Sequence, residues 1–368
     1  MPLEFAGPWS PETDAPQVGF KDPPDHHEAY WLYGYDPDAG VGHYLYLAAE
    51  KDDVLLRRES VFLLLPDGSV LAQHGAGRNS HGATAAGDRL EIECLEPFRR
   101  WRGRYAAPMY RLAGEEIVGG PRPGSELVEA VIDLEATSVA APWNTEGDWG
   151  EQPPSLRYHQ FYDARGSVTV GGTAYPFAGP GFRSHSRRRR DMPGFTGHAI
   201  INGRFPSGRG FGLLRYRATA DRPERGRGFL YLDGVLHDAD VVTWPHLDEA
   251  VAGGERLTIE LRAGRHRAVI TAETIASAFV TPAPEGRKYG AHAGDEPGTV
   301  ISPAFARFQW DGETGYGGLE RSALRSAVTL PSAVTLPSAV TLPSAVAIPS
   351  AVAIPSAGRG DDRRSASC

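Results

Sequence analysis

The sequence has few cysteines, few lysines and no long apolar run. Its two cysteines are Cys94 and Cys368, so it offers neither a disulfide framework nor a cysteine zinc site. No apolar run approaches the ~20 residues that a transmembrane helix needs. The N-terminus has neither the basic start nor the apolar core of a signal peptide. We therefore predict a cytoplasmic protein without a transmembrane segment.

Positive charge is carried almost entirely by arginine, and it does not exceed the negative charge. Lysine occurs only at positions 21, 51 and 288, and the net charge is −8. Nucleic-acid-binding domains usually show a basic balance, so we expect no nucleic-acid partner. A preference for arginine over lysine is typical of a GC-rich coding sequence and carries no functional meaning by itself.

Motifs for metal, phosphate and hydrolase chemistry are also missing. Neither His-Glu-X-X-His nor paired Cys-X-X-Cys occurs, so a metal site would need long-range convergence of ligands. The glycine-rich run at 203–210 lacks the Lys-Ser/Thr of a phosphate loop, and Gly-X-Ser-X-Gly does not occur. We predict neither a metal ion nor a cofactor.

Short segments of period-two alternation dominate the chain. In Arg89–Leu95 and Glu129–Glu135 apolar and charged residues alternate, which predicts strands with one buried and one wet face. Asp-Gly pairs at 67–68 and 233–234 separate apolar runs and predict hairpins. Only His246–Ala252 suggests a short helix. The sequence therefore predicts an all-β fold, and its length fits two consecutive antiparallel barrels or half-barrels.

Composition divides the chain into four parts. Residues 1–25 are rich in proline and acid and predict an extended arm. Residues 26–150 and 151–320 form the two predicted barrel domains, with an irregular joint around 141–156. Residues 321–368 hold three copies of Ser-Ala-Val-Thr-Leu-Pro and two of Ser-Ala-Val-Ala-Ile-Pro. A proline in every copy and too few copies for a β-helix predict a disordered tail.

The densest group of ionisable residues is Gly179–Asp191, which reads Gly-Pro-Gly-Phe-Arg-Ser-His-Ser-Arg-Arg-Arg-Arg-Asp. Its four consecutive arginines, 187–190, are a pattern most often found on a solvated surface. If the run is a strand, two arginines point to each face, and an inward pair needs carboxylates or an anionic ligand. Asp191, Glu146 and Asp148 are the carboxylates nearest in the pattern.

This stretch, with Tyr158–Gly172 before it, resembles a known bacterial family. The family is the group related to carotenoid 1,2-hydratase (hydroxyneurosporene synthase) and the AttH-like proteins, whose fold is a tandem of lipocalin-like β-barrels. Its signature resembles Gly-X-Arg-Asp-His-Ser-Trp-Gly-X-Arg-Asp, and the resemblance covers residues 27–320. Trp310–Ser322 also looks typical of its uncharacterised members. The positions that match the signature are Gly181, Arg183, His185, Ser186, Arg190 and Asp191.

Three positions depart from that signature. Ser184 stands in place of Asp, Arg187 in place of Trp and Arg188 in place of Gly. In the hydratase, the motif's His and Trp are thought to serve protonation of an alkene and capture of the cation by water. Serine cannot supply the strong acid that an alkene needs. Arginine puts positive charge beside a developing cation, where an aromatic face would stabilise it.

The resemblance leaves three alternative functions. We predict lipocalin-like binding of a hydrophobic small molecule, such as an isoprenoid, steroid or other lipid, within a biosynthetic or catabolic pathway. The first alternative is a hydratase, lyase or cyclase, with His185 and Asp191 as acid–base candidates. The second is a non-catalytic interaction protein whose arginines bind an acidic partner. A histidine that fixes a loop through hydrogen bonds is the alternative to an acid–base role for His185. The candidate ligand-binding residues are Arg183, Arg187, Arg190, Tyr158, Trp143 and Trp149.

Overall fold

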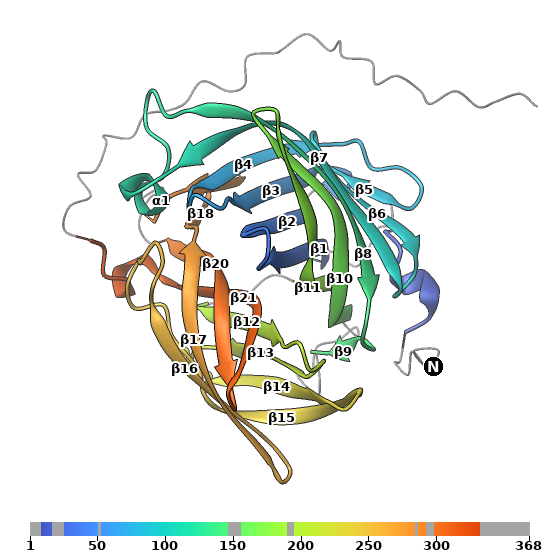
Figure 1. Ribbon diagram of the computed structural model, residues 1–368, viewed down its shortest axis with the longest axis vertical. Helices are drawn as coiled ribbons and strands as arrows, with labels where there is room; N and C mark the ends of the chain where they lie inside the picture. The colour runs from blue at the N-terminus through green and yellow to red at the C-terminus, as the bar shows by residue number, and fades with distance from the viewer. Residues whose placement is uncertain are drawn as a thin grey trace, which may run out of the picture. The chain divides into compact units, whose positions relative to one another are not determined.

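A computed structural model describes residues 9–16, 26–50, 53–145, 156–189, 195–283, 286–291 and 298–331. Over these ranges the chain forms two antiparallel sheets, whose strands run from blue to green and from green to red in Figure 1. In each sheet an additional strand pairing closes a ring of eight strands. The predicted all-β fold of two consecutive barrels is therefore confirmed.

The first barrel closes through the pairing of β4 with β7 and of β1 with β11. The short helix α1 (Glu115–Gly119) lies between β7 and β8. The strands of this sheet are β1 (His26–Asp36), β2 (Val41–Ala49), β3 (Arg57–Leu64), β4 (Val70–Gly77), β5 (Thr84–Ala86), β6 (Leu90–Glu96), β7 (Arg100–Leu112), β8 (Leu127–Ser138), β9 (Trp143–Asn144), β10 (Leu156–Val170) and β11 (Thr173–Arg189).

The second barrel closes through the pairing of β17 with β20. Hairpin β18–β19 extends this sheet beyond the ring. The strands are β12 (His198–Arg204), β13 (Gly210–Tyr216), β14 (Arg225–Leu232), β15 (Val235–Thr243), β16 (Arg256–Ala263), β17 (His266–Ser277), β18 (Val280–Ala283), β19 (Gly286–Tyr289), β20 (Thr299–Trp310) and β21 (Glu313–Leu324).

The first sheet continues to Arg189, so the barrels do not divide at the predicted boundary between residues 150 and 151. β10 pairs with β8 and β11 pairs with β1, and this hairpin completes the first ring. The stretch that contains His185 therefore belongs to the first barrel and not to the second. Alternation after the irregular joint correctly indicated new strands, but it carries no information on which sheet a strand joins.

The ends of the ordered region also differ from the predicted ones. The 3-10 turn η1 (Pro11–Thr13) falls in the predicted arm, and Asp14 after it is fully buried. β21 passes residue 320, and the 3-10 turn η2 (Arg325–Ala327) follows it. The remaining arm residues 1–8 and 17–25, and residues 332–368 of the predicted disordered tail, lie outside the described residues. No helix forms at 246–252, which is an irregular loop.

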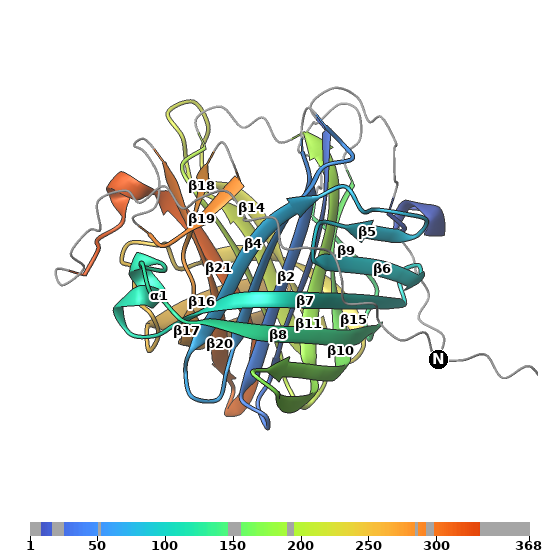
Figure 2. The same cartoon turned by 90° about the horizontal axis from the view of Figure 1, so that it is seen from above.

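Separate apolar cores fill the two barrels, and a third lies between them. Leu45 and Trp101 belong to the first interior, and Ile201 and Phe308 to the second. The core between the barrels is rich in aromatic rings, because the outward residues of β1, β2, β10 and β11 pack against the second sheet. β1 and β11 contact β21. Figures 1 and 2 show the strands of the second sheet, in yellow-green to red, beside those of the first, in blue to green. We call this third core the inter-barrel layer.

Candidate functional site

β1, β10 and β11 place the predicted site residues on the inner face of the first barrel. In the antiparallel register Tyr30 and Tyr158 lie opposite His185, and Leu32 lies opposite Arg183. Residues directly opposite each other share one face of a sheet. Since Tyr30 and Leu32 belong to the interior core, His185 and Arg183 point into the barrel.

Arg183 is held by a buried carboxylate of the N-terminal segment. Its side chain is 3% exposed, and Nη1 and Nη2 donate to the two carboxylate oxygens of Asp14 at 3.0 Å each. Nε and Nη2 also donate to Gln160 Oε1, at 2.9 and 2.7 Å. The guanidinium lies 4.9 Å from the ring centre of Trp101 and 5.0 Å from that of Tyr158. A bidentate pair between aromatic faces leaves the charge of this arginine fully compensated.

His185 lies between two carboxylates and has no exposed side-chain surface. Its Nε2 is 3.3 Å from Glu28 Oε1, and its Nδ1 is 3.7 Å from Asp14 Oδ1. The ring stacks on Tyr30 at 4.4 Å and meets Tyr158 edge-on at 5.8 Å. The imidazole is therefore enclosed on both faces and at both ring nitrogens.

Glu28 joins His185 to two arginines. Its Oε2 accepts from Arg57 Nη2 at 2.9 Å, and its Oε1 accepts from Arg187 Nη2 at 2.9 Å. Burial alone raises the pKa of Glu28, but the hydrogen bond to His185 and the charges of His185, Arg57 and Arg187 outweigh it. They hold the pKa of Glu28 well below its ordinary value. Burial likewise raises the pKa of Asp14, and the charges of Arg183 and His185, with the hydrogen bonds from Arg183, lower it further than burial raises it.

The structure thus brings four predicted residues together: Arg183, His185, Arg187 and Tyr158. Trp143 lies apart from them, in the inter-barrel layer, where its ring packs 4.8 Å from Phe229. Arg190, Asp191 and Trp149 lie outside the described residues, as do Glu146 and Asp148.

Sequence reasoning missed the two carboxylates of this network. Glu28 gave a weak signal, because it lies two residues before Tyr30 and so shares its face of the strand. Asp14 gave none, since it lies 169 positions from Arg183 in an arm without alternation. Through Asp14 the network ties the N-terminal segment to the inner face of the first barrel.

A second histidine, which sequence reasoning also missed, lies where the barrels meet. His198 Nδ1 is 2.6 Å from Ser322 Oγ, and its Nε2 is 3.1 Å from Glu320 Oε1. Tyr44 of the first barrel donates its hydroxyl to Glu320 Oε2 at 3.1 Å. These four groups form one hydrogen-bonded chain that crosses from the second barrel to the first. The side chain of His198 is 14% exposed.

Aromatic rings surround this histidine. Phe195 and Tyr216 have ring centres 5.7 and 6.2 Å from that of His198. On the first barrel Tyr46 stacks beside Tyr44 at 6.4 Å. Tyr46 and Phe195 are both partly exposed. The hydrogen-bonded chain therefore lies at an accessible aromatic margin of the inter-barrel layer.

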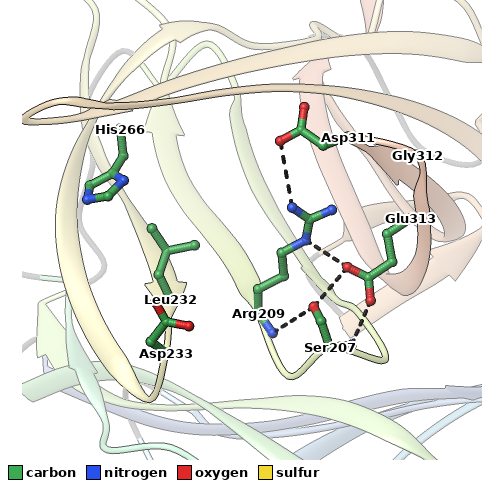
Figure 3. Close-up of a pocket in the computed structure, with 8 residues that line it drawn as sticks. All are labelled: Ser207, Arg209, Leu232, Asp233, His266, Asp311, Gly312 and Glu313. Carbon is green, nitrogen blue, oxygen red and sulfur yellow. Dashed lines mark hydrogen bonds and ion pairs between the residues drawn. The ribbon is translucent and has the colours of Figure 1, made fainter.

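A pocket of about 660 Å³ lies at the end of the second barrel, between four hairpin turns. Figure 3 shows Arg209 and Glu313 directed at each other, with His266 on the far side. Arg209 Nε is 2.8 Å from Glu313 Oε2, and its guanidinium lies 4.3 Å from the ring centre of Trp310. The exposed Asp311 lies 3.7 Å from the same arginine. Two of the pocket's three carboxylates are therefore paired with its own arginine.

Two searches of the described residues gave negative results. Within these ranges no three or more His, Cys, Asp or Glu side chains are grouped so that they could hold a metal ion. No helix in the described part of the chain has the length and apolar character needed to cross a membrane.

A family model described as a domain of unknown function, DUF7064, matches residues 10–325. The chain belongs to this family. The matched range contains both barrels of the DUF7064 chain, together with Asp14 at one end and Glu320 at the other. No curated protein sequence matches it.

Solved structures share the fold of the DUF7064 chain. NE1406 of Nitrosomonas europaea, described as a putative AttH, is 14% identical over 84% of this chain and 98% of its own, with a TM-score of 0.53. CghA, solved with Sch210972, is 10% identical over 82% of this chain and 89% of its own, with a TM-score of 0.50. The AttH-like fold that the sequence motif implied is therefore confirmed.

Proposed function

We propose that this protein binds a hydrophobic small molecule at the margin of the inter-barrel layer. The observation that carries the proposal is that each end of the polar chain lies beside a partly exposed ring, Phe195 next to His198 and Tyr46 next to Tyr44. Ligand sites in proteins are mostly apolar and aromatic, with a few polar groups that fix orientation. The margin has this composition.

The interior of the first barrel fits a ligand less well. Trp101, Tyr105, Tyr158 and Tyr162 each expose 2% or less of their surface, and the charged network of His185 occupies the space beside them. A lipocalin-like barrel filled in this way favours a ligand site outside its interior, and the margin of the inter-barrel layer is the site that we propose. CghA, which shares the two-barrel fold, was solved with Sch210972, and this supports small-molecule binding by the same architecture.

Acid–base chemistry on the bound ligand is the second candidate function. It is favoured by the chain Ser322–His198–Glu320–Tyr44, because a carboxylate at one ring nitrogen stabilises the imidazolium that forms when histidine accepts a proton. His198 is the partly exposed member of that chain. The reaction would be a hydratase-, lyase- or cyclase-type proton transfer, with His198 in the role that the sequence had suggested for His185.

The test is native mass spectrometry of protein purified from its own host, followed by organic extraction and binding titrations with isoprenoids, steroids and fatty acids. We expect a stoichiometric hydrophobic compound. Tyr46→Ala should weaken its binding at least about tenfold, the scale of one lost aromatic contact. Tyr175→Ala is the matched control, because Tyr175 is partly buried against the first interior core and not the inter-barrel layer.

Two results would overturn the proposal. One is the recovery of protein alone together with no binding of any compound of the panel. The other is equal binding by Tyr46→Ala and wild type. The second candidate function, acid–base chemistry, predicts that His198→Gln binds the extracted compound but does not convert it. Conversion by His198→Gln at the wild-type rate would exclude this function.

A further inference from the structure

The first copy of the C-terminal hexapeptide, Ser326–Pro331, is docked on the second barrel. Thr329 forms a parallel bridge with Glu249: its N–H donates to Asp248 O at 2.8 Å, and its carbonyl accepts from Ala250 N–H at 2.9 Å. Val328 is 7% exposed. After the two residues that it shares with η2, the first hexapeptide therefore makes one isolated β-bridge to the second barrel and buries one anchoring side chain.

The anchor lies in an apolar cluster that touches both barrels. Val328 belongs to one cluster with Val118 of helix α1, which comes from the first sheet's β7–β8 connection. Ala291 N–H donates to Val118 O at 2.7 Å, which ties the same helix to the second barrel. We call the surface that receives Val328 the tail groove; its side chains are Leu247, Ala250, Phe279, Val300 and Ala323.

The five copies differ from one another at two positions, neither of which is fully buried in the docked copy. The fourth position changes from Thr to Ala, and its docked representative, Thr329, is exposed. The fifth changes from Leu to Ile, and Leu330 is only partly buried. The third position, the anchor, is valine in all five copies, at 328, 334, 340, 346 and 352.

The backbone bonds of the docked copy impose no further sequence requirement. Both are made by the fourth residue, and alanine supplies the same N–H and carbonyl as threonine. Proline has no N–H to donate, and it occupies the sixth position, outside this bridge, in every copy. Each copy thus has the side chain and the backbone groups that the groove uses.

We propose that the tail groove recognises the repeat unit itself, so that residues 332–337 replace 326–331 when the first copy cannot dock. The second copy is identical to the first in all six residues. Replacement lengthens the connection from the end of β21 by six residues, and the entropic cost of a longer connection grows only slowly with its length. The repeat then serves as a set of interchangeable strands that keep the groove filled, whatever ligand the protein binds.

Hydrogen exchange of the Ala250 amide tests this in the full-length chain, since this amide donates to the docked strand. In Val328→Asp the second copy should dock, and exchange should stay within about threefold of wild type. When all five anchor valines are changed to Asp, exchange should accelerate at least about tenfold. The matched control changes the last four anchor valines to Asp and keeps Val328. Its Ala250 amide should exchange at the wild-type rate.

Two outcomes would overturn the proposal. Equal acceleration in Val328→Asp and in the five-valine variant would show that later copies do not replace the first. Unchanged exchange in the five-valine variant would show that the groove does not depend on the anchor. Exchange of the Tyr162 amide in β10 reports whether each variant stays folded. Val328→Thr, which keeps the volume of the anchor, gives the same comparison if Asp unfolds the chain.

Discussion

Asp14 fixes the N-terminal segment in the first barrel, and replacing it by asparagine tests the charged network. The carboxylate accepts two hydrogen bonds from Arg183 and one from Trp101 Nε1 at 3.1 Å. It also accepts the backbone N–H of Phe98. Asparagine removes the negative charge and turns one acceptor into a donor that faces donors. Removing one member of a buried ion pair costs about 3–5 kcal/mol, so we expect Asp14→Asn to lower the free energy of unfolding by about that much.

The assay is urea unfolding at neutral pH, compared with Glu12→Gln. Glu12 is an exposed acid in the same turn, and its replacement should leave the unfolding midpoint unchanged. In an Arg183→Met background, Asp14→Asn should cost at least ~1 kcal/mol less, because the pair is already broken. The reasoning is refuted if Asp14→Asn destabilises no more than Glu12→Gln. It is also refuted if the effects of the Asp14 and Arg183 changes simply add.

Three further predictions concern other parts of the two barrels. Burial lowers the pKa of His43 to about 3. The free energy of unfolding should therefore fall as the pH drops from ~6.5 towards 3, because the unfolded chain binds a proton that the folded protein does not. The urea midpoint of His43→Gln should change less over this pH range than that of wild type, and an equal change would contradict the prediction. Gly181→Ala places a methyl group 2.1 Å from the Tyr162 ring. Thermal unfolding should show that the variant loses about 1–3 kcal/mol of unfolding free energy, and an unchanged stability would contradict this. His185→Gln should lower the urea midpoint and leave ligand binding unchanged. If His185→Gln and His198→Gln had equal urea midpoints, a structural role of His185 could not be distinguished from that of His198.

The parts of the fold that depend on local chemistry could be predicted from the sequence. The Asp-Gly hairpin at 233–234 forms a two-residue turn, and Gly234 has a φ of 82°, which glycine adopts without strain. The strand at Leu90–Glu96 follows the alternation of its apolar residues. The sheet that β10 and β11 join could not be predicted, because ring closure depends on pairing with β1, more than 140 positions away.

The candidate site shows the same limit at the level of single side chains. Alternation predicted that an inward arginine of the 187–190 run needs carboxylates or an anionic ligand, and Arg187 is paired with a carboxylate. Its partner is Glu28, 159 positions away, and not a nearby acid such as Glu146 or Asp148. A strand pattern determines which face a residue occupies, whereas its partner depends on which strands the fold brings together.

The departures from the family signature act on opposite faces of β11. Arg187 points into the barrel, where its charge is compensated by Glu28, so it belongs to the enclosed network. Ser184 lies opposite Trp31, which belongs to the inter-barrel layer, so the acid missing from the signature is missing from that outer face. Trp31 packs 5.6 Å from Tyr44, whose hydroxyl binds Glu320. A carboxylate is therefore still present at this layer, supplied by β21 with His198 beside it. In the second function proposed above, proton transfer would therefore use this pair rather than His185.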